Sequence, residues 1–462
     1  MEINVNLLKI YKNLRGVVMN ERYKGNETYW SEYSLVEHLK NTCSKDEKYK
    51  NLYAVWTLDQ ETHARALSAI YYNFPHYSMH GESHSLSIIN KIEMLLGEDR
   101  IRSLSPTDTF LILESAYLHD IGMIVSQKEL LEEWKKSSFE RFLKNLEENN
   151  SDSYIVEAAK YLLEMQKSEK PFKDNDWPVK VRRYVTAITS EYYRGKHSVR
   201  SADFIREGAS IGLNSNYNKL IPNRLIVLLQ KIAVSHGTSF EDSFNELEQF
   251  DNGIGTDVIH PRFIASLLRL GDLLDLDDGR FNEVFEKVEY FPDSSKTHKE
   301  KHKSITLFLV SPEKIQVSAV CKDPDSYRET RSWFDWLKEE VKNLSSRWSD
   351  IVPKGFKGGP PSLGNIKLTM EGSENIKEQL DLQSNIDPKR AFELIEGQGI
   401  YSDKLIFIRE LIQNAMDATK IQMWKDIKYG KYDGVSEDLL GIDEVRLKEI
   451  KNKKDFEFPS DL

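Results

Sequence analysis

A strongly apolar segment of this chain ends in Ala116-Tyr117-Leu118-His119-Asp120-Ile121-Gly122. The adjacent imidazole and carboxylate in this run are ligand types that suit divalent transition metals, and a carboxylate can bridge two ions. Because neighbouring positions on a helix lie about 100° apart, the two side chains can straddle an ion beside the helix. The run therefore predicts one wall of a metal site.

Four more imidazole or carboxylate side chains, before and after this pair, extend the pattern. Each stands on or beside a segment whose apolar spacing predicts a helix. Helical bundles build metal sites in this way, with single ligands projecting from facing helices. Two divalent ions held together are a general device for cleaving phosphate esters. In chain order the candidate ligands are His84, His119, Asp120, His197, His236 and Asp272.

Composition is typical of a folded, soluble chain without a disulfide framework. The 462 residues suffice for several domains, with 39% hydrophobic and 30% charged residues. The two cysteines, Cys43 and Cys321, lie far apart and offer no thiolate metal site. No apolar run reaches the roughly 20 residues of a membrane helix, and the N-terminus carries no secretory-signal pattern. We therefore expect a cytoplasmic protein without a membrane partner.

Charge narrows the class of ligand. Lysine and arginine number 64 against 74 for aspartate and glutamate, a net charge of −10. This balance argues against broad, non-specific nucleic-acid binding. A local basic pocket for a phosphorylated small molecule is still compatible with it.

Apolar spacing typical of amphipathic helices covers most of the chain before Arg280. Thr107 and Asp108 are predicted to cap the helix that leads into His119. The charged stretch at 128–168 is helix-permissive and predicts a solvated insertion. The other helices are predicted around 33–39 and 58–72, and at 83–96, 110–118, 180–207, 222–236 and 262–276.

The pattern changes after Arg280 and predicts a small α+β subdomain. Residues 304–310 and 314–320 are β-like and are separated by a turn that contains proline. A helix rich in tryptophan follows, and then a Gly/Pro break and a third predicted strand at 365–370.

The ordered ligand set resembles the HD-domain superfamily of metal-dependent phosphohydrolases. The matching positions are His84, the pair His119-Asp120, and Asp272 at the end of Leu268-Arg269-Leu270-Gly271-Asp272. The intervening His197 and His236 resemble the extra histidines of members that hold two metals. The resemblance covers roughly residues 76–280.

This resemblance implies roles for the six residues. His84, His119, Asp120 and Asp272 would hold one divalent ion. Asp120 would bridge to a second ion held also by His197 and His236, and these two histidines determine whether one ion or two are bound. Mn, Fe, Mg, Ni, Co and Zn all suit such ligands. The implied substrate is a phosphorylated small molecule of nucleotide type.

Four cations near the ligands are candidates for phosphate binding. For the three around His197, the alternative interpretation is a solvated basic face of the helix. They are Arg194, Lys196 and Arg200 around His197, and Arg269 one turn before Asp272.

Two more assignments stay open in the sequence. His80 competes with His84 as the first ligand, and Asp275 is either a partner of a ligand or a helix cap. Asp277 and Asp278 are predicted to lie in a turn that ends at Gly279.

A second motif occupies residues 406–421, where Glu410, Asn414 and Asp417 share one helical face. It resembles the first ATP-site helix of the GHKL ATPases, the group that includes gyrase, histidine kinases, MutL and the heat-shock chaperone ATPases. The resemblance implies that Glu410 activates water and that Asn414 binds Mg²⁺.

These ATPases also need an Asp-x-Gly-x-Gly motif downstream, and none follows Asn414. The one at 251–255 lies upstream, and we predict a loop there. ATP and Mg²⁺ are therefore expected to bind only if the missing half is supplied.

The predicted fold is mainly α, with a helical HD-type domain, a small α+β subdomain and an incomplete GHKL-like α/β segment. The predicted division is an N-terminal helical segment at 1–75, the HD-type domain at 76–285, the α+β extension at 286–375 and the GHKL-like part at 376–462.

The leading functional hypothesis is a phosphohydrolase coupled to the ATPase-type module. The alternatives are a non-catalytic nucleotide sensor and a chaperone-like regulator that uses the HD domain as a scaffold. Analogy of architecture alone suggests bacterial stress or antiviral defence. Self-association into a homo-oligomer also stays open.

Overall fold

The computed structural model describes residues 34–75, 81–150, 152–167, 179–208, 213, 220–276 and 293–371. The chain divides into two compact units, Met1–Leu380 and Asp381–Leu462, and every described residue belongs to the first. The motif with Glu410, Asn414 and Asp417 lies outside the described residues. The same holds for His80, Asp277 and Asp278.

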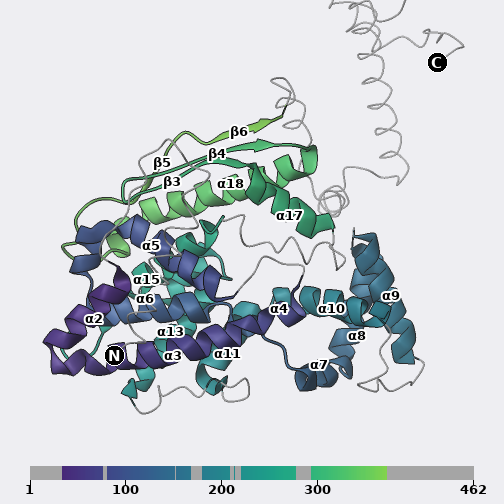
Figure 1. Ribbon diagram of the computed structural model, residues 1–462, viewed down its shortest axis with the longest axis horizontal. Coiled ribbons are helices and arrows are strands. Elements are labelled where there is room, and N and C mark those ends of the chain that lie inside the picture. The colour runs from purple at the N-terminus through teal and green to yellow at the C-terminus, as the bar shows by residue number, and fades with distance from the viewer. Residues whose placement is uncertain are drawn as a thin grey trace, which may run out of the picture. The chain divides into compact units, whose positions relative to one another are not determined.

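Helices make up most of the described residues, which confirms the predicted mainly α class with a small α+β part. The central helix is α6 (Pro106–Leu118), in which every residue from Thr107 to Leu118 is buried. A helix that is apolar on all sides needs cover on all sides. Its neighbours are α2 (Leu35–Lys45), α3 (Lys50–Ser68), α5 (Glu82–Ser103), α13 (Asn223–Ser235) and α15 (Pro261–Leu273) (Figure 1).

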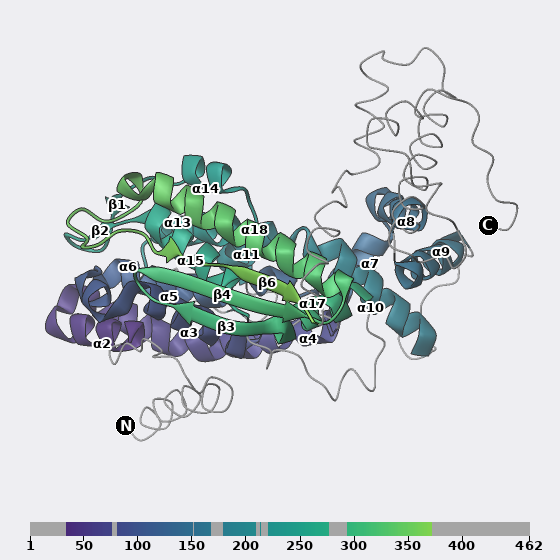
Figure 2. The same cartoon turned by 90° about the horizontal axis from the view of Figure 1, so that it is seen from above.

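The charged stretch at 128–168 is helical, as predicted, and contributes aromatic side chains to the hydrophobic core. Phe139 packs edge-on against Tyr192 with ring centroids 4.9 Å apart, and Phe142 lies 5.0 Å from the same ring. These helices gather at the opposite end of the helical body from α2 (Figures 1 and 2). They are α7 (Gln127–Trp134), α8 (Ser137–Asn149), α9 (Ser153–Lys167) and α10 (Val179–Arg194).

Several shorter elements complete the helical body. The element that matters most for the ligands is α11 (His197–Glu207), which packs along α13. The others are α4 (Ile70–Asn73), α14 (Phe240–Glu246), η1 (Glu47–Tyr49), η2 (Ile121–Met123) and η5 (Trp348–Asp350).

The α+β part has the predicted strands β3 (Ile305–Val310) and β4 (Lys314–Cys321), paired antiparallel. The short strand β5 (Ser362–Leu363) was not predicted, whereas β6 (Lys367–Met370) was. Both pair parallel with β4. Parallel pairing needs a long crossover, and the chain makes it through α18 (Pro324–Ser346).

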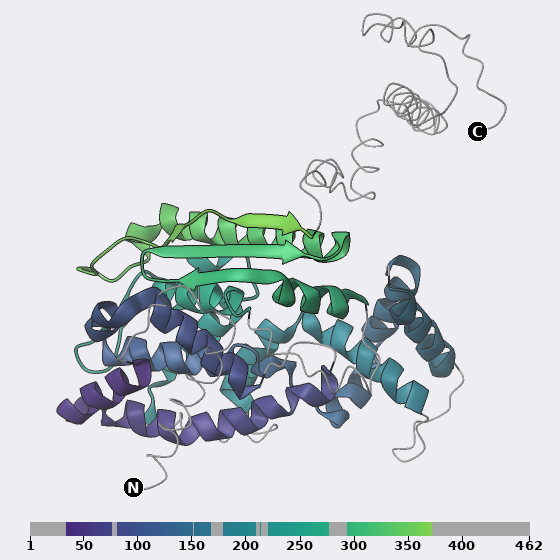
Figure 3. The same cartoon turned by 45° about the horizontal axis from the view of Figure 1, so that its top comes forward.

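One face of this sheet is covered. Ile315, Val317, Ala319 and Cys321 alternate along β4 and are buried. Helix α18 packs against β4 and β6, and α17 (Asp293–Ser304) packs against α18 (Figures 2 and 3). Because α18 also contacts α15, it joins the sheet to the helical body.

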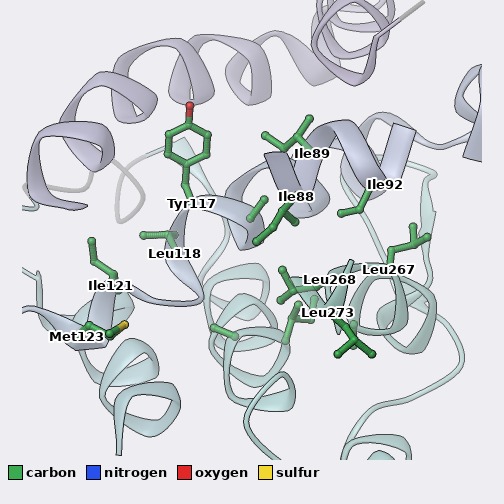
Figure 4. Close-up of a cluster of buried hydrophobic side chains, with 14 of the residues drawn as sticks. Ile88, Ile89, Ile92, Tyr117, Leu118, Ile121, Met123, Leu267, Leu268 and Leu273 are labelled. Atoms are coloured by element: carbon green, nitrogen blue, oxygen red, sulfur yellow. The ribbon is translucent and has the colours of Figure 1, made fainter. Parts of the chain in front are cut away.

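The apolar core surrounds the run that ends α6. Tyr117 and Leu118 before the His-Asp pair, and Ile121 and Met123 after it, belong to one cluster of buried hydrophobic side chains that also includes residues of α5 and α15 (Figure 4). The backbone that carries the pair is therefore anchored on both sides by apolar burial, worth about 1.5–3 kcal/mol per large side chain.

The predicted cap of α6 was wrong by two residues. Ser105 is the N-cap, its side chain accepts from the backbone of Asp108, and a proline follows it. Thr107 donates its hydroxyl to Asp257 at 2.9 Å instead.

The glycine motif at 251–255 is a turn, as predicted. It connects β1 (Asp251–Asn252) to β2 (Val258–Ile259), and Gly255 has a φ of +63° that only glycine adopts easily. Within the described residues, no helix has the length and apolar character needed to span a membrane.

Candidate metal centre

The His-Asp pair stands at the end of α6, where His119 is the C-cap and Asp120 leads into η2. Ser201 of α11 fixes this turn. Its hydroxyl donates to the His119 carbonyl at 2.5 Å and accepts from the Gly122 backbone N–H at 2.9 Å. One buried side chain thus satisfies two backbone groups beyond the helix end.

Gly122 lets α11 approach this turn. A Cβ at that position would overlap backbone atoms of His197 and Ser201 on α11. Only glycine therefore allows the helix that starts at His197 to lie directly on the turn that carries Asp120.

The structure brings all six predicted ligands together from five elements. Three of them offer one ligand atom each within 4.8 Å of one another, and we call His84, His119 and Asp272 the first group. The same holds for Asp120, His197 and His236, which we call the second group.

Within the first group, the Nε2 atoms of His84 and His119 lie 3.2 Å apart. The Oδ1 atom of Asp272 lies 3.3 Å from Nε2 of His84 and 3.9 Å from Nε2 of His119. His84 and His119 are each only 1% exposed, so this pair is held deep in the core.

Within the second group, the Nε2 atoms of His197 and His236 lie 2.8 Å apart. Oδ1 of Asp120 lies 3.4 Å from the first and 3.6 Å from the second. The other carboxylate oxygen of Asp120, Oδ2, faces the first group, 3.4 Å from His84 and 3.2 Å from His119. Asp120 therefore presents one oxygen to each pair of histidines.

The opposite ring nitrogen of each histidine has an acceptor. Nδ1 of His119, His197 and His236 faces the carbonyl oxygen three residues earlier, in the last turn of α6, α10 and α13 respectively. Such carbonyls lack an intrahelical donor. Nδ1 of His84 instead faces Oδ2 of Asp275 at 2.5 Å.

These contacts fix the tautomer. An acceptor at Nδ1 requires the proton there, so each ring, when it is neutral, turns the lone pair of Nε2 toward the centre. Two Nε2 lone pairs at 3.2 Å and two at 2.8 Å repel each other unless a cation lies with them. The donor set, with its protons directed outward, fits divalent metal ions.

The carboxylate of the first group is suited to a cation. Burial alone would raise the pKa of Asp272, but the hydrogen bond with His84 and the charge of His119 hold it well below its usual range. The acid is therefore ionised.

Asp275 contacts a ligand, which was one of the two predicted alternatives. It accepts from Nδ1 of His84 and, at 2.6 Å, from the hydroxyl of Ser87. It thereby orients the His84 ring.

Two of the predicted phosphate-binding cations have structural contacts. Arg200 donates to the carbonyls of Gly122 and Ile124 at 2.7 and 2.6 Å and pairs with Glu129. Arg269 is buried and donates to Glu340 and to backbone carbonyls. These contacts favour structural roles over the predicted phosphate binding.

For the other two cations, phosphate binding stays a prediction. Lys196 lies 3.3 Å from the ring centroid of Tyr192, and burial lowers its pKa. The Arg194 side chain is exposed. The pKa of Glu329 on α18 is lowered mainly by its hydrogen bond with His298, and the charge of Arg194 adds only a small part.

Sequence reasoning missed Ser201 and Glu340. Ser201 stands four residues after His197, on the same helical face, and this spacing was the available signal. Nothing in the sequence pointed to Glu340, whose role depends on a contact with Arg269 far away in the chain.

Comparison with known proteins gives one match. Residues 74–343 match the family HD-CE, which is an HD-type domain family. No curated protein and no solved structure matches the chain. The matched region contains all six ligands and most of α18. Since it covers more than half of the sequence, the chain belongs to the HD-CE family.

Proposed function

We propose that this chain is a metal-dependent phosphohydrolase that holds two divalent ions and acts on a phosphoester or phosphoanhydride of a nucleotide-like molecule. One observation carries the proposal. The two oxygens of Asp120 face two different histidine pairs, 3.2–3.4 Å from the first and 3.4–3.6 Å from the second. A bridging carboxylate between two ions needs this arrangement.

The six candidate ligands would position two ions. The first group with Asp120 would hold one ion, and the second group would hold the other. Bound divalent ions supply Lewis-acid activation of phosphate and water. Histidine and carboxylate ligands accept Mn, Fe, Co, Ni, Zn or Mg, so ion identity is an outcome of the test.

Exposure supports one direction of substrate approach. The side chains of Asp272 and His197 are 34% and 24% exposed, whereas that of His84 is 1% exposed. A phosphate would therefore approach between the end of α15 and the start of α11. Lys196 and Arg194 precede His197 in the chain and are our proposed phosphate contacts.

The test is elemental analysis of the native protein, followed by a nucleotide panel with wild type and Asp120→Ala. We expect bound metal, hydrolysis of at least one phosphorylated compound, and its loss in the variant. Loss of about 4 kcal/mol of transition-state stabilisation corresponds to roughly a thousandfold slower reaction. Full activity in Asp120→Ala would refute the proposal.

A matched control is Asp108→Asn. Asp108 is a buried carboxylate of the same helix and pairs with His260 at 2.9 Å, outside the ligand set. This variant should keep its metal and its activity.

Two other results of these experiments would favour one of the alternative functions. Stabilisation by a nucleotide without product would indicate a sensor. A native protein without metal would favour a chaperone-like scaffold.

We also propose that 376–462 contains the first ATP-site helix of a GHKL-type module. The proposal rests on the resemblance around Glu410, Asn414 and Asp417 alone. ATP turnover by the chain supplied with the missing half should disappear in Glu410→Ala, and turnover that survives this change would contradict the assignment of Glu410.

A further inference from the structure

A buried ion pair connects the α+β part to the helical body. Arg269 on α15 and Glu340 on α18 form two parallel hydrogen bonds, Nε to Oε1 at 2.6 Å and Nη2 to Oε2 at 2.9 Å. Both residues are buried, at 8% and 5% exposure. The paired geometry fixes the plane of the guanidinium.

The third nitrogen of Arg269 contacts the backbone beside His236, a residue of the second group. Nη1 donates to the carbonyls of Ser235 and Thr238, the latter at 2.7 Å. These two carbonyls stand on either side of His236. Because α13 ends at Ser235, the guanidinium supplies donors where the helix has none.

The same turn of α15 serves both groups. Arg269 precedes the ligand Asp272 by three residues, so the two side chains share one helical face. Asp272 belongs to the first group, while Arg269 holds the turn of the second. The orientation of this one helical turn therefore affects the positions of both Asp272 and the backbone beside His236.

We infer that Glu340 positions His236 through Arg269, so that the α+β extension sets the affinity of the second group for its ion. This inference rests on the proposed two-metal site. Arg269 and Glu340 touch no ligand atom, and both are positioning residues.

Stability alone does not account for the pair. A buried ion pair contributes little net stability compared with a packed apolar pair of similar volume. An apolar pair cannot, however, donate to two carbonyls beside His236. This difference separates a positioning role from a packing role.

The experiment measures Mn²⁺ binding to the full chain, by titration calorimetry and by the electron paramagnetic resonance signal of coupled ions. The main variant is Arg269→Met/Glu340→Met, which leaves no unpaired buried charge and should fold. We expect one ion to bind as in wild type and the other roughly 10–100-fold more weakly, the usual effect of removing a partner beyond the ligands. Glu340→Gln should weaken the same ion by a smaller factor.

Arg262→Met is the matched control. Arg262 lies on the same helix and donates to the carbonyls of Phe244 and Leu247 at 3.0 and 2.7 Å, which flank no ligand. It should lower the melting temperature without changing either Mn²⁺ affinity.

Two outcomes would overturn the positioning role while the proposed function stands. One is a double variant that binds two ions with wild-type affinity. The other is equal weakening of both ions. A wild-type chain that binds no Mn²⁺ would instead remove the metal site itself, and this inference with it.

Discussion

The two candidate metal-binding groups of this chain are built differently. The histidines of the first group are 1% exposed, and the ring of His84 is held by the buried carboxylate of Asp275. In the second group, the side chain of His197 is 24% exposed, and both histidines rely on backbone carbonyls. Core packing thus places the first group, whereas contacts from α11 and α18 place the second.

Metal binding at the two groups can therefore be altered in different ways. A change to either histidine of the first group must disturb the apolar core around α6. A change to the second can act through the approach of α11 or through the pair Arg269–Glu340. We therefore expect the first group to bind its ion more tightly.

The largest effect should come from removing one histidine of the first group. In His119→Ala, no water can readily replace the ring because the site is buried. We expect metal affinity at the first group to fall by more than roughly 100-fold, beyond the effect of losing an outer partner. In His197→Ala, water can enter, and a fall of roughly tenfold is expected. Calorimetric titration of both variants with Mn²⁺ compares them, and equal losses would remove the distinction.

The next effect concerns the contact between the groups. Gly122→Ala places a methyl group against the backbone of His197 and Ser201, which cannot move without shifting α11. Overpacking of this kind costs about 3 kcal/mol. We expect that loss in urea unfolding, together with weakened binding at the second group and an intact first group. A variant with wild-type stability would show that α11 adjusts freely.

A smaller effect should come from Asp275→Asn. Asparagine keeps the shape but loses the charge that orients His84. We expect roughly tenfold weaker binding at the first group, the lower end of the usual range, and no change at the second. Asp108→Asn changes a similar buried His–Asp pair outside the site and should leave both affinities unchanged. If both variants weaken binding alike, the role of Asp275 is not specific.

The first group and the helices that carry it were predictable from the sequence. The apolar run before His119 and the apolar stripe before Asp272 each predict a buried helix. Burial fixes the orientation of such a helix and therefore limits where the ligand at its end can project. The β3–β4 pair was equally predictable, since a turn with proline separates two β-like runs.

The contacts around the second group were not predictable. Gly122 acts through close approach and Glu340 through long-range pairing, and neither leaves a period in the sequence. For Ser201 the four-residue spacing from His197 was the available signal, but it does not reveal the contact with the turn at Gly122. The prediction of the N-cap of α6 was wrong for a related reason. Thr107 and Ser105 both have capping side chains, and only the contact of Thr107 with Asp257 assigns the cap to Ser105.

The smallest effect separates burial from metal binding. Asp59 on α3 is 3% exposed and belongs to neither group, and its Oδ2 has no hydrogen-bond partner in the described part of the chain. Burial raises its pKa from 3.8 to about 6. Because the pKa is higher in the folded protein, ionisation opposes folding. The penalty is absent below about pH 3, grows as the pH rises from about 4 to about 6, and is constant above about pH 7.

Asp59→Asn removes this penalty but leaves a buried amide. We therefore expect a net gain of about 1 kcal/mol at pH 8 that disappears by about pH 3, since the acid is then neutral in both states. Thermal melts at the two pH values measure it. Unchanged Mn²⁺ affinity at both groups would show that a buried carboxylate affects stability here without being part of the site. An equal gain at about pH 3 and pH 8 would contradict the ionisation argument, because the amide would then stabilise through packing alone.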